Sequence, residues 1–304
     1  RVLVALEPVL VAEKPDLVLV QGDTTTALGG ALAAFHQRIP VGHVEAGLRS
    51  GDPLSPYPEE MNRRLITQLA TFHFAATPRN RDTLLGEGVS ADTVFLTGNP
   101  VVDALQTMLA HNTVSTALRE LLQATEGFRR LTLTTHRRES FGPVLTANLV
   151  ALRDFVTAHE DIVLIFPVHL NPQVRGPAAD VLGGLPRVHL LPPLDYCDFI
   201  GLLARSWLIV SDSGGVQEEA PSLGVPLLIL RKNTERLEAI ECGGARLAGD
   251  DPAHLRALLE EAYRAPGGGH NGVNPFGQGD SGKRIAAAVL RIFNGTAMTT
   301  RMSC

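Results

Sequence analysis

Short runs of apolar, often β-branched residues alternate along this chain with longer segments in which apolar residues recur every three or four positions. The short runs are typical of buried parallel strands, and the longer segments have the period of helices that cover a sheet. The predicted strands span residues 17–20, 41–44, 94–97, 131–134, 162–166, 188–191, 208–210 and 225–230. The predicted helices span residues 27–37, 59–69, 144–159, 198–204 and 252–265.

This alternation of strands and helices predicts an α/β fold with parallel sheets. Eight strands and their crossovers exceed what one doubly wound sheet usually holds, so we expect two Rossmann-like domains. Gly98, Asn99 and Pro100 mark the expected hinge between them. The first domain would comprise residues 1–102, and the second domain residues 103–279. A C-terminal helix at residues 280–295 would return to the first domain.

The beginning of the chain is amphipathic, with apolar residues at Val2, Leu3, Leu6 and Val9. It has neither the charged leader nor the apolar core of a signal peptide. We expect the chain to begin inside a helix, with the leading strands of the first domain missing before it.

Composition narrows the class of protein. The 304 residues are 44% hydrophobic and 19% charged, as in an ordinary folded domain. A net charge of −5 provides no basic surface, so we expect no nucleic-acid partner. The apolar runs are far shorter than the roughly 20 residues that span a bilayer, so we expect no membrane partner either. Three widely spaced cysteines fit a reducing compartment, and the cytoplasm is the expected location.

Ligands of open α/β sheets bind beyond the carboxyl ends of the strands, so polar residues that follow the apolar runs are candidates. Asp23 follows the first run and would be either a helix cap, a role that Thr24 could also take, or a functional carboxylate. Glu45 closes the second run. A buried carboxylate costs several kcal/mol unless it is paired, so Glu45 is either bonded to Arg49 or kept for function.

Two further charged groups allow both a structural and a functional interpretation. Glu59 and Glu60 would stand in the first turn of a helix, where the helix dipole favours carboxylates. His136, Arg137 and Arg138 follow the predicted strand at residues 131–134. They would be either a solvated turn or a site for an anion, because guanidinium groups match phosphate geometry.

The most specific local signal is Ser213-Gly214-Gly215, where a strand leads into a helix. Small residues there let a phosphate approach the unpaired N–H groups of the helix N-terminus. Glu219 follows inside the same helix and could accept hydrogen bonds from ribose hydroxyls. The segment therefore predicts a nucleotide site.

Other nucleotide-binding classes lack their motifs here. The chain has neither the G-x-G-x-x-G of the usual dinucleotide fold nor the P-loop of NTPases. None of its three tyrosines is followed four residues later by lysine, which excludes the Tyr-x-x-x-Lys pair of short-chain NAD-dependent sugar epimerases.

Taken together, the motifs of the chain resemble those of the bacterial non-hydrolysing UDP-N-acetylglucosamine 2-epimerases. The motifs that carry the resemblance are Gln21-Gly22-Asp23-Thr24-Thr25, His43-Val44-Glu45-Ala46-Gly47-Leu48-Arg49, Pro58-Glu59-Glu60 with Asn62-Arg63, Thr135-His136-Arg137-Arg138-Glu139, Pro167-Val168-His169-Leu170-Asn171-Pro172 and Ser211-Asp212-Ser213-Gly214-Gly215. Further matches occur at Thr234-Glu235-Arg236 and Asn274-Pro275-Phe276-Gly277, so the resemblance covers nearly the whole chain.

The resemblance implies a fold similar to the two-domain GT-B glycosyltransferases and a cytoplasmic isomerase that serves cell-envelope polysaccharide synthesis. It implies no cofactor and no metal, and relatives are commonly homodimers. The residues that it implies for catalysis are Asp23, Glu45, Glu59 and His136. Those that it implies for UDP binding are Phe199, Ser213, Gly214, Gly215, Glu219 and Arg236. Contacts to a possible second, activating UDP-GlcNAc would come from Arg137, Arg138 and His169.

The chain departs from the family at its start, because the leading strand and its Gly-Thr-Arg-Pro-Glu loop are absent. The reaction implied by the resemblance is reversible inversion at C2 of UDP-N-acetylglucosamine to UDP-N-acetylmannosamine, through elimination of UDP to 2-acetamidoglucal and its re-addition. The alternatives are a hydrolysing 2-epimerase, a GT-B glycosyltransferase and a truncated nucleotide-binding module without turnover.

Overall fold

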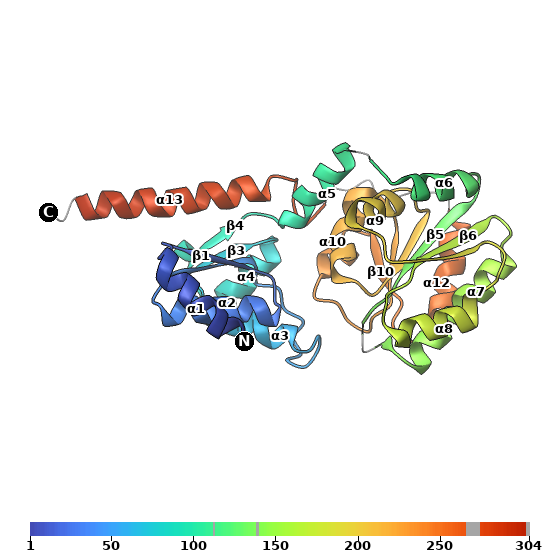
Figure 1. The fold of residues 1–304 in the computed structure, drawn as a ribbon, viewed down its shortest axis with the longest axis horizontal. Helices are drawn as coiled ribbons and strands as arrows, with labels where there is room; N and C mark the ends of the chain where they lie inside the picture. Colours follow the sequence, from blue (N-terminus) through green and yellow to red (C-terminus); the bar gives the residue numbers. More distant parts are fainter. Residues whose placement is uncertain (112, 138–139, 266–273, 302–304) are drawn as a thin grey trace. The chain divides into compact units, whose positions relative to one another are not determined.

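The computed structural model describes residues 1–111, 113–137, 140–265 and 274–301. The chain divides into two compact units, one formed by Arg1–Asp103 with Phe276–Cys304 and the other by Ala104–Pro275. We call them unit 1 and unit 2. In Figure 1, unit 1 runs from blue to cyan and includes the red C-terminal helix, and unit 2 runs from green to orange. The sequence analysis predicted the corresponding domain boundaries after residues 102 and 279, compared with 103 and 275 in the structure.

Unit 1 contains a four-stranded parallel sheet with the strand order β1-β2-β3-β4. Its strands are β1 (Val18–Gln21), β2 (Val41–Ala46), β3 (Phe72–Ala75) and β4 (Val94–Leu96). Its helices are α1 (Val2–Glu13), α2 (Thr25–His36), α3 (Glu59–Leu69), α4 (Pro78–Gly86), the short η1 (Ala91–Thr93), the start of α5 (Pro100–His111) and α13 (Ser281–Arg301).

Side-chain alternation along β2 distributes the core of unit 1 over both faces of the sheet. Val41 packs with residues of α2 and α3, whereas Val44 packs with Ile285 and Ala288 of α13. The Asp103 carboxylate of α5 accepts bonds from the first two backbone N–H groups of α13, at 3.0 and 2.9 Å. The C-terminal helix is thereby attached to the sheet of unit 1, although it is distant in sequence (Figure 1).

Unit 2 contains a six-stranded parallel sheet with the order β10-β9-β8-β5-β6-β7. Its strands are β5 (Arg129–Thr134), β6 (Ile162–Pro167), β7 (Val188–Leu191), β8 (Leu208–Ser211), β9 (Leu227–Ile229) and β10 (Ala245–Leu247). Its helices are the rest of α5, α6 (Thr116–Ala124), α7 (Pro143–Ala158), α8 (Pro172–Leu182), α9 (Tyr196–Leu203), α10 (Gly214–Leu223), α11 (Leu237–Glu241) and α12 (Pro252–Arg264).

The core of unit 2 lies mainly on the face covered by α7, α8 and α12. Leu131 and Leu133 of β5 are fully buried there, together with alternate residues of β6 and β8: Ile162, Leu164, Phe166, Leu208 and Val210. Ile165 of β6 points to the opposite face, where it packs with Leu118 of α6 and Leu202 of α9. Residues of β5 with even numbers therefore face α6 and α9.

The eight strands that the apolar runs predict are all present. Two strands were missed: β3, which carries His73, and the edge strand β10, which carries Arg246. In each of them a polar residue interrupts an already short run, His73 in β3 and Arg246 in β10, so no continuous apolar pattern stands out. Residues 98 and 99 of the expected hinge directly precede α5, which begins at Pro100, and the two units divide inside that helix, after Asp103. Among the helices of the described residues, none is both long and apolar enough to cross a bilayer.

Candidate functional site

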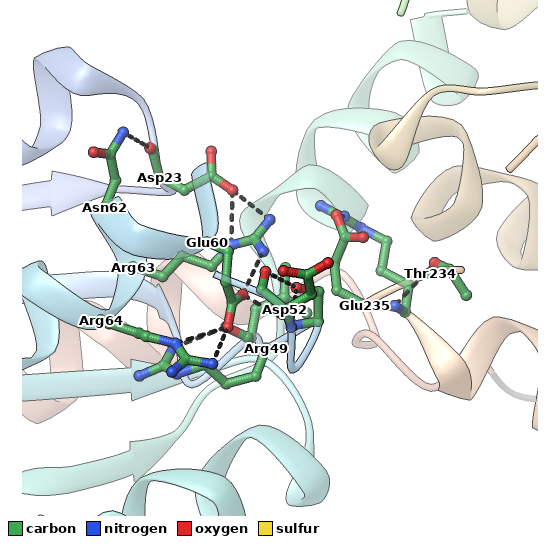
Figure 2. Close-up of polar contacts among 12 residues, drawn as sticks. Asp23, Arg49, Asp52, Glu60, Asn62, Arg63, Arg64, Thr234 and Glu235 are labelled. Atoms are coloured by element: carbon green, nitrogen blue, oxygen red, sulfur yellow. Dashed lines mark hydrogen bonds and ion pairs between the residues drawn. The ribbon is translucent and has the colours of Figure 1, made fainter. Parts of the chain in front are cut away.

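The carboxyl end of β1 presents a carboxylate that is held in place from α3. Thr24 caps α2 by accepting a 3.1 Å bond from Ala27, so the cap does not use Asp23. The Asp23 carboxylate accepts bonds from Arg63, at 2.9 Å from Nε and 2.7 Å from Nη2. Asn62 donates to the carbonyl of Asp23 at 2.8 Å (Figure 2). Asp23 is therefore fixed through both its side chain and its backbone.

Glu60 is the buried member of this network. Its side chain has no exposed surface and accepts bonds from Arg63 at 3.1 Å, Arg64 at 3.0 Å and the backbone N–H of Ser50 at 2.9 Å. Figure 2 shows Glu60 and Asp23 on either side of the Arg63 guanidinium. Glu59, which precedes it, is only half-buried, in the first turn of α3. The helix-dipole interpretation applied equally to both glutamates, and the resemblance assigned only Glu59 to catalysis. The fold gives the two residues different surroundings.

Glu45 stands at an irregularity of β2. Its φ angle is +68°, and the register with β3 shifts between Val44 and Ala46. A side chain placed on Gly22 would lie 3.4 Å from Glu45 Oε2, so the Glu45 carboxylate lies beside the turn that carries Asp23. Two of the predicted carboxylates are thus brought to the same turn.

The same turn rests on a buried imidazole. His43 Nε2 lies 2.9 Å from the carbonyl of Gly22 and donates to it. Burial lowers the pKa of His43 to about 4, so the ring is neutral near pH 7. Arg49 forms a bidentate ion pair with Glu87 at 2.8 and 2.7 Å.

In unit 2, the fully buried carboxylate of Asp212 organises the loop that follows β5. It accepts bonds from Thr135 Oγ1 at 2.6 Å and from the backbone N–H groups of His136 and Arg137, each at 3.0 Å. His136 Nδ1 lies 3.4 Å from the same carboxylate, and Arg137 Nε donates to the Asp212 carbonyl at 3.0 Å. His136 remains 44% exposed, and its ring centroid is 6.0 Å from that of His169.

The start of α10 combines a helix N-terminus with a guanidinium group. Ser213 precedes the helix, and its side chain makes no capping bond among the described residues. A Cβ on Gly214 would lie only 2.8 Å from Arg236 Nη1, so the Arg236 side chain lies against the first turn. Arg236 is itself buried and donates to Glu218 at 2.7 Å and to Glu235. Helix dipole and guanidinium both favour an anion at this position.

Glu219 lies further along α10 and is almost fully buried. It accepts a 2.9 Å bond from Tyr196 Oη at the start of α9. Burial raises the pKa of Glu219, and the bond from Tyr196 opposes that rise. The pKa of Tyr196 is raised by burial and by the neighbouring carboxylate. Phe199 is half-buried in the next turn of α9.

The structure therefore brings Asp23 and Glu45 to one turn in unit 1, and in unit 2 it brings Arg236 against Gly214 and His136 beside His169. Arg138 lies outside the described residues. Sequence reasoning missed four residues that hold these groups in place: Glu60, Arg63, Tyr196 and Asp212. Asp212 carried a usable signal, because a carboxylate directly after an apolar strand must find partners when it is buried.

Two parallel α/β units with polar groups at the carboxyl ends of their sheets define a protein of the GT-B-like class, as do its structural relatives. The UDP-N-acetylglucosamine 2-epimerase family profile matches residues 1–290. The chain is 47% identical over 300 residues to the UDP-N-acetylglucosamine 2-epimerase of Escherichia coli K12. The aligned region covers 95% of this chain and 79% of that protein. The chain belongs to this family.

Solved structures agree with this assignment. The structure of S. aureus MnaA with UDP has a TM-score of 0.92 at 38% identity, and the match covers 96% of this chain and 80% of that one. The UDP-GlcNAc 2-epimerase from Neisseria meningitidis bound to UDP-GlcNAc has a TM-score of 0.89 at 40% identity, with 95% and 80% covered.

Proposed function

We propose that this chain interconverts UDP-N-acetylglucosamine and UDP-N-acetylmannosamine without releasing free sugar. The observation that carries the proposal is the position of Arg236 against Gly214, at the N-terminus of α10, in a chain of this family. The second support is the pair of carboxylates, Asp23 and Glu45, beside one turn at the end of β1.

The chemistry follows from the position of the reacting C–H bond. C2 of the sugar is not next to a carbonyl group, so a side-chain base alone cannot remove its hydrogen. Cleavage of the C1–O bond solves this problem: the electron pair leaves with UDP, positive charge at C1 acidifies the C2 hydrogen, and its loss gives 2-acetamidoglucal. Protonation of C2 from the other face and re-addition of UDP at C1 then complete the inversion.

Each half of this reaction needs a different kind of group. Charge that develops on the departing diphosphate requires donors that are already oriented, a role we assign to Arg236, the amides of residues 213–215 and His136. Proton removal and delivery on opposite faces of the ring require at least two carboxylates with separate pKa values. We assign this role to Asp23, Glu45 and Glu59 as a group, and the reaction needs no metal or nicotinamide.

The remaining predicted residues serve binding in this proposal. Glu219, oriented by Tyr196, would accept from the ribose hydroxyls, and Phe199 would pack against uracil. Arg137, Arg138 and His169 would contact a second UDP-GlcNAc. The active assembly would be a homodimer, which sedimentation of the purified chain would reveal.

Turnover in D₂O tests the chemistry. Elimination and re-addition must place solvent deuterium at C2 of the product, because the hydrogen is exchanged in every cycle. Mass spectrometry and NMR of UDP-sugars after incubation with UDP-GlcNAc would detect this label. An unlabelled manno product would exclude the mechanism.

The same incubation separates the proposal from its rivals. Accumulation of UDP and free N-acetylmannosamine would identify a hydrolysing epimerase, whereas the proposal expects an equilibrium between the two UDP-sugars. Calorimetry with UDP completes the comparison: binding without turnover would identify a nucleotide-binding module instead.

A further inference from the structure

A pocket lined by charged and apolar side chains lies near the start of β5, at the other end of the unit 2 sheet. It has a volume of about 430 Å³ and is lined by Val114, Arg119, Leu122, Gln123, Glu126, Arg130 and Arg205. Three of these residues are arginines, and Glu126 is the one acidic residue among the described residues that line the pocket. We propose that this pocket binds a phosphorylated small molecule, separately from the nucleotide site at α10.

The fold brings the three arginines together from separate elements. Arg130 belongs to β5 and has an even number, so it points to the face that α6 and α9 cover. Arg119 lies on α6, and Arg205 follows the end of α9. A Cβ on Gly201 would lie only 2.4 Å from Val114, so glycine in α9 permits the close approach that forms one wall of the pocket.

The position of α6 is fixed by polar contacts as well as by packing. The backbone N–H of Ser115 donates to Asp198 of α9 at 2.7 Å, and Leu118 is buried against Leu202. Because these contacts attach the start of α6 to α9, they also hold Arg119 near Arg130 and Arg205. The pocket is therefore present before any ligand binds, which lowers the entropic cost of binding.

The guanidinium groups are oriented by neutral oxygen atoms. Arg130 donates to Thr125 Oγ1 and to the Leu122 carbonyl, both at 2.8 Å. Arg119 donates to the Val114 carbonyl at 3.2 Å, and Arg205 donates to the Gly201 carbonyl at 2.9 Å. These bonds restrict the orientation of the guanidinium groups, and the acceptor atoms named carry no formal charge.

The charges within the pocket influence one another. Burial lowers the pKa of Arg130, the Glu126 carboxylate opposes this shift, and the charge of Arg205 adds to it. Three cations and one carboxylate leave a net charge of about +2 on the lining, which suits the charge of a phosphate monoester near pH 7. Val114 and Leu122 add apolar surface for an organic body.

The sheet separates this pocket from the nucleotide site. Arg130 lies near the start of β5, whereas His136 follows its end. Six residues of strand at about 3.3 Å each place the two ends about 20 Å apart. A molecule in the pocket therefore does not overlap UDP bound at α10.

Calorimetry of the full chain tests the inference. With UDP present at saturation and ionic strength held constant, titration with glucose 6-phosphate should show one site, pyrophosphate should bind to the same site, and glucose should not bind. Arg119→Ala and Arg205→Ala should each weaken binding about tenfold, because each removes a charge-assisted contact. Both side chains are exposed, so the variants should fold normally.

Two further variants control this result. Arg264→Ala removes an exposed arginine of the same unit that does not line the pocket, and binding should be unchanged. Glu126→Gln should tighten binding a few-fold, because it removes the negative charge. The inference is overturned if neither phosphate compound binds at millimolar concentration, or if binding is the same in Arg119→Ala and Arg264→Ala. These results do not depend on epimerase turnover, so failure here and failure of the proposed function are distinguishable.

Discussion

In unit 1 an arginine holds a carboxylate at the carboxyl end of the sheet, whereas in unit 2 carboxylates hold an arginine. Arg63 binds Asp23 and is itself held by Glu60. Arg236 lies against the start of α10 and is held by Glu218 and Glu235. The same kind of buried ion pair therefore positions a carboxylate after β1 in unit 1 and a guanidinium beside the start of α10 in unit 2.

The difference between the two units matches the two halves of the proposed reaction. The Asp23 side chain is 22% exposed and that of Arg63 only 3%, so within this pair the carboxylate is the group that reaches solvent. Unit 2 offers a guanidinium and the backbone N–H groups at the start of a helix, which suit a diphosphate. In both units, charge that is buried next to an opposite charge holds the functional group in one orientation.

The largest expected effect is on stability. Glu60→Ala leaves Arg63 buried without one of its carboxylate partners, and we expect the free energy of unfolding to fall by about 3–5 kcal/mol. Urea unfolding measures this loss. Glu59→Ala is the matched control, because that half-buried residue should contribute only about 0.3–1 kcal/mol through the helix dipole. Equal losses in the two variants would show that Glu60 does not support the network.

The next effect is on catalysis. Asp23→Asn should reduce kcat by at least ~10²-fold, equivalent to about 2.7 kcal/mol, because it removes a proton-transfer group. Affinity for UDP should be unchanged, since its proposed contacts lie in unit 2. Thr24→Ala is the control: loss of the cap of α2 should cost about 1 kcal/mol of stability and leave turnover intact. Near-normal turnover of Asp23→Asn would remove Asp23 from the mechanism.

Acid should weaken unit 1 through His43. The pKa of His43 falls from 6.5 to about 4 because the ring is buried; Arg49 and His73 add to the shift, and Gly22 O and Asp23 oppose it. The unfolded chain then binds a proton that the folded chain does not, so stability is complete above pH 6.5 and is lost as the pH falls towards 4.

Between pH 7.5 and pH 5 this amounts to roughly 2 kcal/mol. Urea unfolding at the two pH values should show a smaller loss in His43→Gln than in the unchanged chain, and His169→Gln, an exposed control, should behave like the unchanged chain. Burial of His73 lowers its pKa and adds a contribution of the same sign. Burial raises the pKa of Glu219, so the stability of unit 2 depends on pH in the opposite direction through this residue. Its contribution to the free energy of unfolding is complete below pH 4.5 and is lost as the pH rises above that value. An identical acid loss in His43→Gln and the unchanged chain would exclude His43 as the source.

The smallest expected effect separates ligand contact from protein packing at α10. A Cβ on Gly215 meets open space, with Ser213 Oγ as its nearest neighbour at 4.0 Å, so Gly215→Ala should leave the melting temperature unchanged. It should raise the Kd for UDP about tenfold, or about 1.4 kcal/mol, because a phosphate would meet the methyl group. Gly214→Ala should impair both properties, since its Cβ displaces Arg236. Unchanged UDP binding in Gly215→Ala would place the phosphates elsewhere.

Much of the architecture follows from local pattern alone. The predicted helix at residues 59–69 has the same bounds as α3, and every predicted strand overlaps an observed one. Long periodic segments and runs of β-branched residues carry this information directly, because each residue contributes to the same signal. Strands β3 and β10 were not predicted, because His73 and Arg246 interrupt their short apolar runs and remove this signal.

The candidate site was only partly readable. Asp23, Glu45 and Arg236 could be selected because motif and position relative to a strand are sequence properties. Their partners could not be selected: Arg63 is 40 residues from Asp23, and Glu218 is 18 residues from Arg236. Only the packing of helices on each sheet brings these charges within bonding distance.

By itself the sequence determined the parallel α/β class, the family and the order of the chemical motifs. Hydrophobic periodicity and motif residues involve neighbouring positions in the chain, so they can be recognised without knowledge of the fold. The tertiary structure decided which charges are buried and which partners neutralise them. It separated Glu60 from Glu59, and it assembled three distant arginines around one pocket. Burial and ion pairing depend on contacts between residues far apart in the chain, so these properties exist only once the sheet and its covering helices have formed.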